Sequence, residues 1–207
     1  MRYYYINNIV LDIYKNMPKI QFPLNPLLVA NLIPNSRFMS YQKFAKISNC
    51  NLQDVICLCK SKSGCTHYDV NSSRYLTLIN ISEVYNSKPR QRWTIAHEIG
   101  HILCKHHIIL MENNSSNGCF SIAFTPEYET EADYFAVTLL SPFPLFSILN
   151  IRNPLDIQIR FGISNKAANI RFEEYKKWKK SHRKTAWEND IVKVYKSKAV
   201  EPHYEVS

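Results

Sequence analysis

Glycine is scarce in this sequence, with four among 207 residues, and long uninterrupted runs of apolar residues are missing. So few glycines argue against an all-β or loop-rich protein. A membrane-spanning helix needs about 20 consecutive apolar residues, so none is predicted. The N-terminus lacks the apolar stretch of a secretory signal, because Asn7, Asn8 and Asp12 interrupt it. We therefore expect a cytoplasmic protein that does not contact a membrane.

Acidic residues are also few, with 17 Asp and Glu against 26 Lys and Arg, and the formal net charge is +9. Most of the excess positive charge lies between Lys166 and Lys198, a segment with 11 basic and four acidic residues. A basic segment can contact nucleic acid or an acidic partner, but it is more often a solvated helix face. The six cysteines are expected to be free thiols, since no secretory signal is predicted.

A hydrophobic content of 45% is sufficient for the core of one domain with a small appendage. Periodicity and turn residues predict a mainly helical α+β fold with a small mixed or antiparallel sheet. We expect a first domain over 1–150, a helical pair over 151–185 and a basic tail over 186–207. The expected helices cover 4–17, 26–32, 51–59, 89–107, 126–140, 154–160 and 165–180. The expected strands cover 65–68, 74–79, 120–124 and 191–195, with a loop over 112–118.

The sequence contains an HExxH pattern, which is typical of zinc-binding sites, and it begins at His97 inside an apolar predicted helix. Residues four apart lie on one helical face, so His97 and His101 point the same way and can both bind one zinc ion. Glu98 lies beside them, where it can take a proton from water at the metal. Gly100 weakens a helix, so it indicates that another segment approaches the backbone closely.

A catalytic zinc site needs a third protein ligand and a position open to water. The helix predicted over 126–140 opens with four acidic residues: Glu127, Glu129, Glu131 and Asp133. Glu129 and Asp133 share one face, which suits a Glu ligand beside an Asp that fixes the tautomer of a ligating histidine. Glu131 lies about 200° around the helix from Glu129, so both cannot face one ion. We predict Glu129 as the ligand and keep Glu131 as the alternative, although acids also suit a helix start without any metal.

Three segments carry a resemblance to a known family. Residues 92–101 (RWTIAHEIGH) and 129–142 (ETEADYFAVTLLSP) resemble the ImmA/IrrE family of metallo-endopeptidases, which typically reads FTIAHELGH and then ExEAxxFAxxLLMP. Residues 161–171 (FGISNKAANIR) are similar to the family segment FGVSxxAxxxR. The sequence departs from the family pattern at Trp93, Ile99 and Ser141, where Phe, Leu and Met are usual. The resemblance covers about residues 74–172.

The resemblance implies a zincin-like domain and a cytosolic, zinc-dependent peptidase of prokaryotes, phages or mobile elements. Such peptidases cleave a helix-turn-helix repressor and thereby activate silenced genes. Carried over residue by residue, the resemblance implies His97 and His101 as zinc ligands, Glu98 as the general base and Glu129 as the third ligand. Asp133 is expected to support one of the histidines.

Other features leave alternatives open. Candidates for the donor that stabilises the oxyanion are His106, His107 and Tyr134, although a frayed helix end explains the two histidines better. The basic pair of helices over 154–180 resembles a helix-turn-helix, but DNA contact is the less favoured interpretation, because helix pairs joined by a glycine turn are common.

The alternative function is a non-catalytic, toxin–antitoxin-like regulator that binds DNA or a repressor and has a structural or degenerate zinc site. The intact Glu98 favours the peptidase, since a structural site needs no general base.

Overall fold

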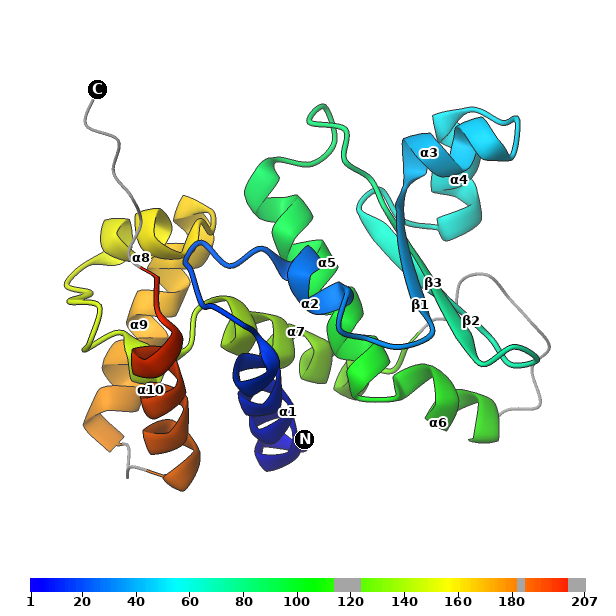
Figure 1. The fold of residues 1–207 in the computed structure, drawn as a ribbon. Coiled ribbons are helices and arrows are strands. Elements are labelled where there is room, and N and C mark those ends of the chain that lie inside the picture. The colour runs from blue at the N-terminus through cyan, green and yellow to red at the C-terminus, as the bar shows by residue number, and fades with distance from the viewer. Residues whose placement is uncertain (114–123, 182–184, 201–207) are drawn as a thin grey trace. The chain divides into compact units, whose positions relative to one another are not determined.

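The computed structural model describes residues 1–113, 124–181 and 185–200, and it divides into two compact units. The first unit comprises Met1–Arg2 and Pro26–Ala136, and the second comprises Tyr3–Asn25 and Val137–Ser207. Both contain helices, and the strands form one small sheet, so the prediction of a mainly helical α+β fold is confirmed (Figure 1). None of the helices in the described ranges is long and apolar enough to cross a membrane.

The first unit is built around a sheet and the helix that follows it in the chain. Its elements are α2 (Pro26–Ala30), β1 (Ser36–Ser40), α3 (Tyr41–Ile47), α4 (Leu52–Cys59), β2 (Gly64–Asp69), β3 (Arg74–Ile79), α5 (Lys88–Leu103), α6 (His106–Asn113) and the part of α7 (Pro126–Leu140) up to Ala136. β3 is the central strand, parallel to β1 and antiparallel to β2 (Figure 1). The hairpin predicted from 65–68 and 74–79 is therefore confirmed.

Apolar side chains hold α5 and the small helices on this sheet. α5 contacts β2 and β3, and it buries Ile95, Ile99 and Ile102. A second group of apolar side chains joins α3 and α4 to the sheet: Tyr41, Ala45, Val55, Ile56, Cys59, Cys65 and Leu78. Burial of such side chains stabilises the unit by about 1.5–3 kcal/mol for each large residue. The sheet thereby provides a rigid support for the HExxH helix.

The second unit is helical. Its elements are α1 (Tyr3–Asn16), the end of α7, a 3-10 turn (Phe143–Leu145), α8 (Pro154–Phe161), α9 (Asn165–Ser181) and α10 (Ala186–Lys198). Phe146 packs against both Phe161 and Tyr175 in its core. Arg171 donates to the carbonyl oxygen of Ser141 from two of its nitrogens, at 2.9 and 3.3 Å. This buried arginine thus joins α9 to the end of α7.

Several predicted elements differ from the structure. The helix expected over 89–107 is wrong at its end, because Lys105 takes a φ of 61° and separates α5 from α6. The strand expected over 191–195 is wrong, since packing of α10 against α1 outweighs the local β propensity of its valines. Glu112 and Asn113 lie in α6 rather than in a loop. The rest of that loop and residues 120–123 of the expected strand lie outside the described residues.

Two elements were not predicted at all, and the division of the chain differs from the expected one. β1 and α3 are short and carry little periodicity, so their sequences did not reveal them. Residues 3–25 and 137–150, which we grouped with the first domain, belong to the second compact unit. The expected domains were continuous segments of the chain, whereas each compact unit contains segments that are distant in the chain and pack together.

Candidate metal centre and active site

Three side chains from α5 and α7 converge on one point. Nε2 of His97 lies 3.0 Å from Nε2 of His101 and 3.2 Å from Oε2 of Glu129. Nε2 of His101 lies 3.7 Å from Oε1 of Glu129. Ligand atoms around a tetrahedral zinc ion lie about 3.3 Å apart, because each is about 2.0 Å from the metal. Both the donor types and their spacing therefore fit a zinc ion.

The charges around these donors favour a cation. Nδ1 of His97 lies 2.9 Å from Oδ1 of Asp133, so the carboxylate holds a proton on Nδ1 and leaves Nε2 facing Glu129. Burial disfavours a charged His97, but the hydrogen bonds to Asp133 and Glu129 outweigh it and raise its pKa to about 9. Hydrogen bonds with His101 and His97 hold the pKa of Glu129 well below its usual range. The site thus has a negative potential that attracts protons or a metal ion.

Glu98 is held by a pair of threonines on the sheet. Its side chain is buried, and its Oε2 accepts a hydrogen bond of 2.7 Å from Oγ1 of Thr66. Oγ1 of Thr66 lies 3.0 Å from Oγ1 of Thr77, its partner in the register of β2 and β3. Because Thr66 gives its only hydroxyl proton to the carboxylate, Thr77 must be the donor of this second bond. Two buried hydroxyls therefore orient the predicted general base.

These residues lie at a cleft of about 770 Å³ in the first unit. His97, Glu98, Glu129 and Asp133 line it together with Trp93, and further lining residues come from the end of α4 and from β2. Glu129 is 48% exposed and Asp133 is 58% exposed, so a molecule in the cleft can reach both carboxylates. None of the three candidate oxyanion donors is among the described residues that line this cleft.

His106 and His107 do not form a frayed helix end, so that interpretation is wrong. Both side chains are fully buried at the start of α6. Burial lowers the pKa of His106 to about 4 and that of His107 to about 3. Nε2 of His107 lies 3.2 Å from the carbonyl oxygen of Thr66, whereas His106 contacts His101 and Glu131. Two consecutive histidines were visible in the sequence, but the break between α5 and α6 at Lys105 was not.

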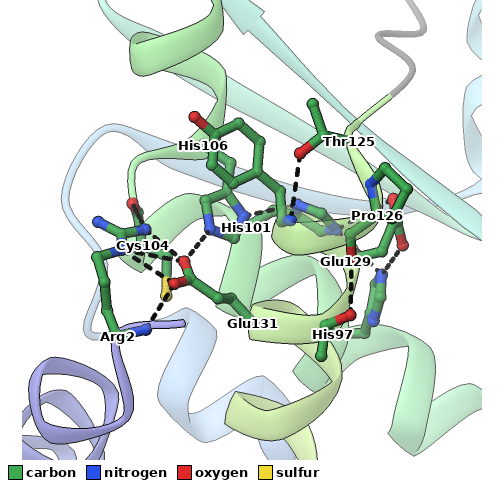
Figure 2. Close-up of polar contacts among 11 residues, drawn as sticks. Arg2, His97, His101, Cys104, His106, Thr125, Pro126, Glu129 and Glu131 are labelled. Atoms are coloured by element: carbon green, nitrogen blue, oxygen red, sulfur yellow. Dashed lines mark hydrogen bonds and ion pairs between the residues drawn. The ribbon is translucent and has the colours of Figure 1, made fainter.

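Glu131 points away from the two histidines of the HExxH motif (Figure 2). It accepts hydrogen bonds from the backbone N–H of Arg2, at 2.8 Å, and from the guanidinium of Arg2. Burial alone would raise its pKa, but these bonds outweigh it and lower the pKa of Glu131 to about 2. The predicted alternative to Glu129 therefore has a different set of partners. Nothing in the sequence linked residue 2 to this helix.

Gly100 lies where α5 crosses α7. A Cβ added there would lie 3.1 Å from the Cα of Ala132 and 3.2 Å from its carbonyl oxygen. The sequence predicted that some segment approaches this glycine, and the structure identifies it as α7. Because α7 carries Glu129 and Asp133, this close crossing sets the distance from the carboxylates to the histidines.

A comparison with protein families agrees with this geometry. The peptidase-family model described as the IrrE N-terminal-like domain matches residues 56–173. This match covers more than half of the chain and includes β2, β3, α5, α6 and α7. No curated protein matches the chain at a significant level.

Proposed function

Because the chain belongs to the peptidase family of the IrrE N-terminal-like domain, we propose that it is a zinc-dependent endopeptidase. In this proposal His97, His101 and Glu129 hold the zinc ion, and Glu98 is the general base. The observation that carries the proposal is the convergence of three zinc-type donors beside a buried carboxylate in one open cleft. A metal site with a purely structural role would need neither the open cleft nor the carboxylate.

Each of the site residues has its own role in the proposed hydrolysis of the peptide bond. A bound zinc ion supplies Lewis-acid polarisation of the peptide carbonyl and activation of a water molecule. Glu98 accepts the proton of the attacking water and returns it to the nitrogen of the leaving amine. Thr66 holds Oε2 of Glu98 at 2.7 Å, and in this proposal Oε1 carries the transferred proton. Asp133 keeps His97 in the tautomer that leaves Nε2 for the metal.

The proposed substrate is a helix-turn-helix repressor, as the family resemblance implies. Cleavage would inactivate the repressor and derepress genes of a phage, a mobile element or a stress response. The reaction would take place in the cytoplasm, where such a repressor binds DNA. The cleft of about 770 Å³ supports a peptide substrate, since a cleft of this volume can admit an extended segment of chain.

The proposal is tested by incubating the purified chain, loaded with Zn²⁺, with the helix-turn-helix protein encoded next to it. Mass spectrometry of the products should show discrete fragments with the wild type. The Glu98→Gln variant should keep its zinc but produce fragments at least about 100-fold more slowly, which is the usual contribution of a general base. An intact partner after incubation with the wild type, or equal cleavage by Glu98→Gln, would exclude this function.

The same experiment distinguishes the peptidase from the non-catalytic alternative. A regulator that acts by binding would form a complex with the repressor and leave it intact. The Glu98→Gln variant would then bind the repressor as well as the wild type does. The hydrogen bond from Thr66 to Glu98, together with the bond between Thr66 and Thr77, supports catalysis, because it orients a carboxylate that a binding protein would not use.

A further inference from the structure

A chain of polar contacts runs from His101 through the buried side chains of His106 and Glu131 to Arg2 (Figure 2). Nδ1 of His101 lies 2.9 Å from Nδ1 of His106, and Nε2 of His106 lies 3.1 Å from Oε2 of Glu131. Arg2 closes the chain, with its Nη2 2.6 Å from the same carboxylate oxygen. His106 is fully buried and Glu131 is 4% exposed. Of these four residues, only His101 is one of the proposed metal ligands.

The hydrogen-bonding capacity of these groups determines where the protons lie. The carboxylate of Glu131, paired with Arg2, can only accept, so Nε2 of His106 donates to it. Nδ1 of a neutral His106 is then an acceptor, and Nδ1 of His101 must donate to it. The lone pair of His101 is thereby left on Nε2, the atom that faces His97 and Glu129. The opposite assignment would place a proton on that atom and block a metal ion.

We propose that His106, Glu131 and Arg2 are positioning residues that hold His101 in the tautomer required for metal binding. This inference rests on the proposed function, which makes His101 a zinc ligand. His101 would then resemble His97, whose Nδ1 is held by Asp133. The two supports differ in character, because Asp133 is 58% exposed whereas His106 and Glu131 are buried. In this proposal the affinity for metal depends on Arg2, which lies 99 positions before His101 in the sequence.

The break between α5 and α6 makes this arrangement possible. On an uninterrupted helix, residue 106 would lie about 140° around the axis from residue 101 and could not reach its ring. The positive φ of Lys105 turns the chain, and Nη2 of Arg2 donates to the carbonyl oxygen of Cys104 at the turn. The ring of His106 also stacks on Tyr128, with 4.6 Å between the ring centroids. Its orientation is therefore fixed from several sides.

Zinc affinity of the full chain, measured by competition with a chromophoric chelator, tests the proposal. His106→Leu removes the acceptor and should weaken zinc binding by about 10–100-fold, the usual effect of losing such a support. The matched control is His107→Leu, which removes an equally buried histidine with no hydrogen bond to His101 and should stay within about threefold of the wild type. His106→Asn restores an acceptor oxygen near the Nδ1 position and should recover much of the affinity. Equal losses in the two leucine variants would overturn the proposal.

Histidine side-chain ¹⁵N spectra of the zinc-loaded wild type give a second test that requires no variant. The proposal predicts a proton on Nδ1 of His101 and on Nε2 of His106. A proton on Nδ1 of His106 would overturn it, whatever the variants do. The result is separable from the proposed function: zinc binding with these tautomers but no cleavage rejects only the peptidase, whereas cleavage with wild-type zinc affinity in His106→Leu rejects only the positioning chain.

Discussion

Thr66 donates a hydrogen bond of 2.7 Å to Glu98, and this bond joins the edge strand β2 to the helix that carries the HExxH motif. The contact spans 32 residues of the chain. It connects two features that the sequence presents separately, a threonine in a predicted hairpin and a glutamate between two histidines.

Thr66→Val should lower the rate of peptide cleavage by about 10-fold, because the carboxylate of Glu98 loses the donor that orients it. Valine keeps the shape of threonine, so the change removes the hydroxyl with little loss of packing. Thr66→Ser, which retains the hydroxyl, is the matched control and should stay close to the wild type. The measurement is kcat, with thermal unfolding followed by circular dichroism to verify the fold. Equal activity of the valine and serine variants would show that the bond does not matter.

Glu129→Ala should reduce the zinc content of the purified protein well below one equivalent, since it removes one of three ligands. Glu127→Ala is the control, because Glu127 is exposed in the first turn of the same helix and is not part of the donor group. Metal content is measured by mass spectrometry of the acid-digested protein. Removal of zinc with a chelator should abolish cleavage in the wild type, and added Zn²⁺ should restore it. Full zinc retention in Glu129→Ala would exclude Glu129 as a ligand.

Gly100→Ala should destabilise the protein, although alanine normally favours a helix over glycine by about 1 kcal/mol. The added methyl group would lie 3.1 Å from the Cα of Ala132, and backbone atoms of a packed helix cannot easily move away. We expect the free energy of unfolding to fall by about 1–2 kcal/mol, as in other overpacked contacts. Urea denaturation measures this change. A gain in stability would mean that α7 can shift without cost.

His107→Leu should make stability less dependent on pH. Burial lowers the pKa of His107 to about 3, and His101 and His106 add to this effect. In the unfolded chain the pKa of histidine is about 6.5, so between these values the unfolded state binds the proton and the folded state does not. The free energy of unfolding of the wild type should therefore fall as the pH decreases below about 6.5.

Urea denaturation of metal-free protein over this pH range measures the decline. The slope should be smaller in His107→Leu, since leucine cannot be protonated in the unfolded state. His106 contributes in the same direction through its own lowered pKa, so part of the decline should remain in the variant. Identical slopes in the two proteins would contradict the assignment to His107.

Much of the candidate site was predictable because its geometry is local. His97 and His101 are four residues apart, as are Glu129 and Asp133, and helical periodicity alone places each pair on one face. The expected contact of Asp133 with a histidine of the motif is present at 2.9 Å. Gly100 was likewise predictable as a point of close approach, because glycine weakens a helix, and its close neighbour is α7.

Other parts of the site could not be predicted, because they depend on contacts between distant segments. Arg2 and Glu131 are separated by 129 positions, and no periodicity connects them. The roles of His106 and His107 depend on the left-handed conformation of Lys105, a residue type that gives no signal for it. The strand expected over 191–195 failed for a similar reason, since packing against α1 decided its conformation.

The amino-acid sequence by itself determined the HExxH helix and the acid-rich helix after it, and therefore the two histidine donors of the proposed zinc site and the two candidates, Glu129 and Glu131, for the third. These follow from the helical repeat, which acts over a single turn. Only the tertiary structure decided that Glu129 rather than Glu131 faces the histidines and that Thr66 donates a hydrogen bond to Glu98. It also decided that His106 contacts His101 and that Arg2 and His106 share the carboxylate of Glu131. Those relationships arise where separate helices and strands pack together, and packing is a property of the whole unit rather than of any segment.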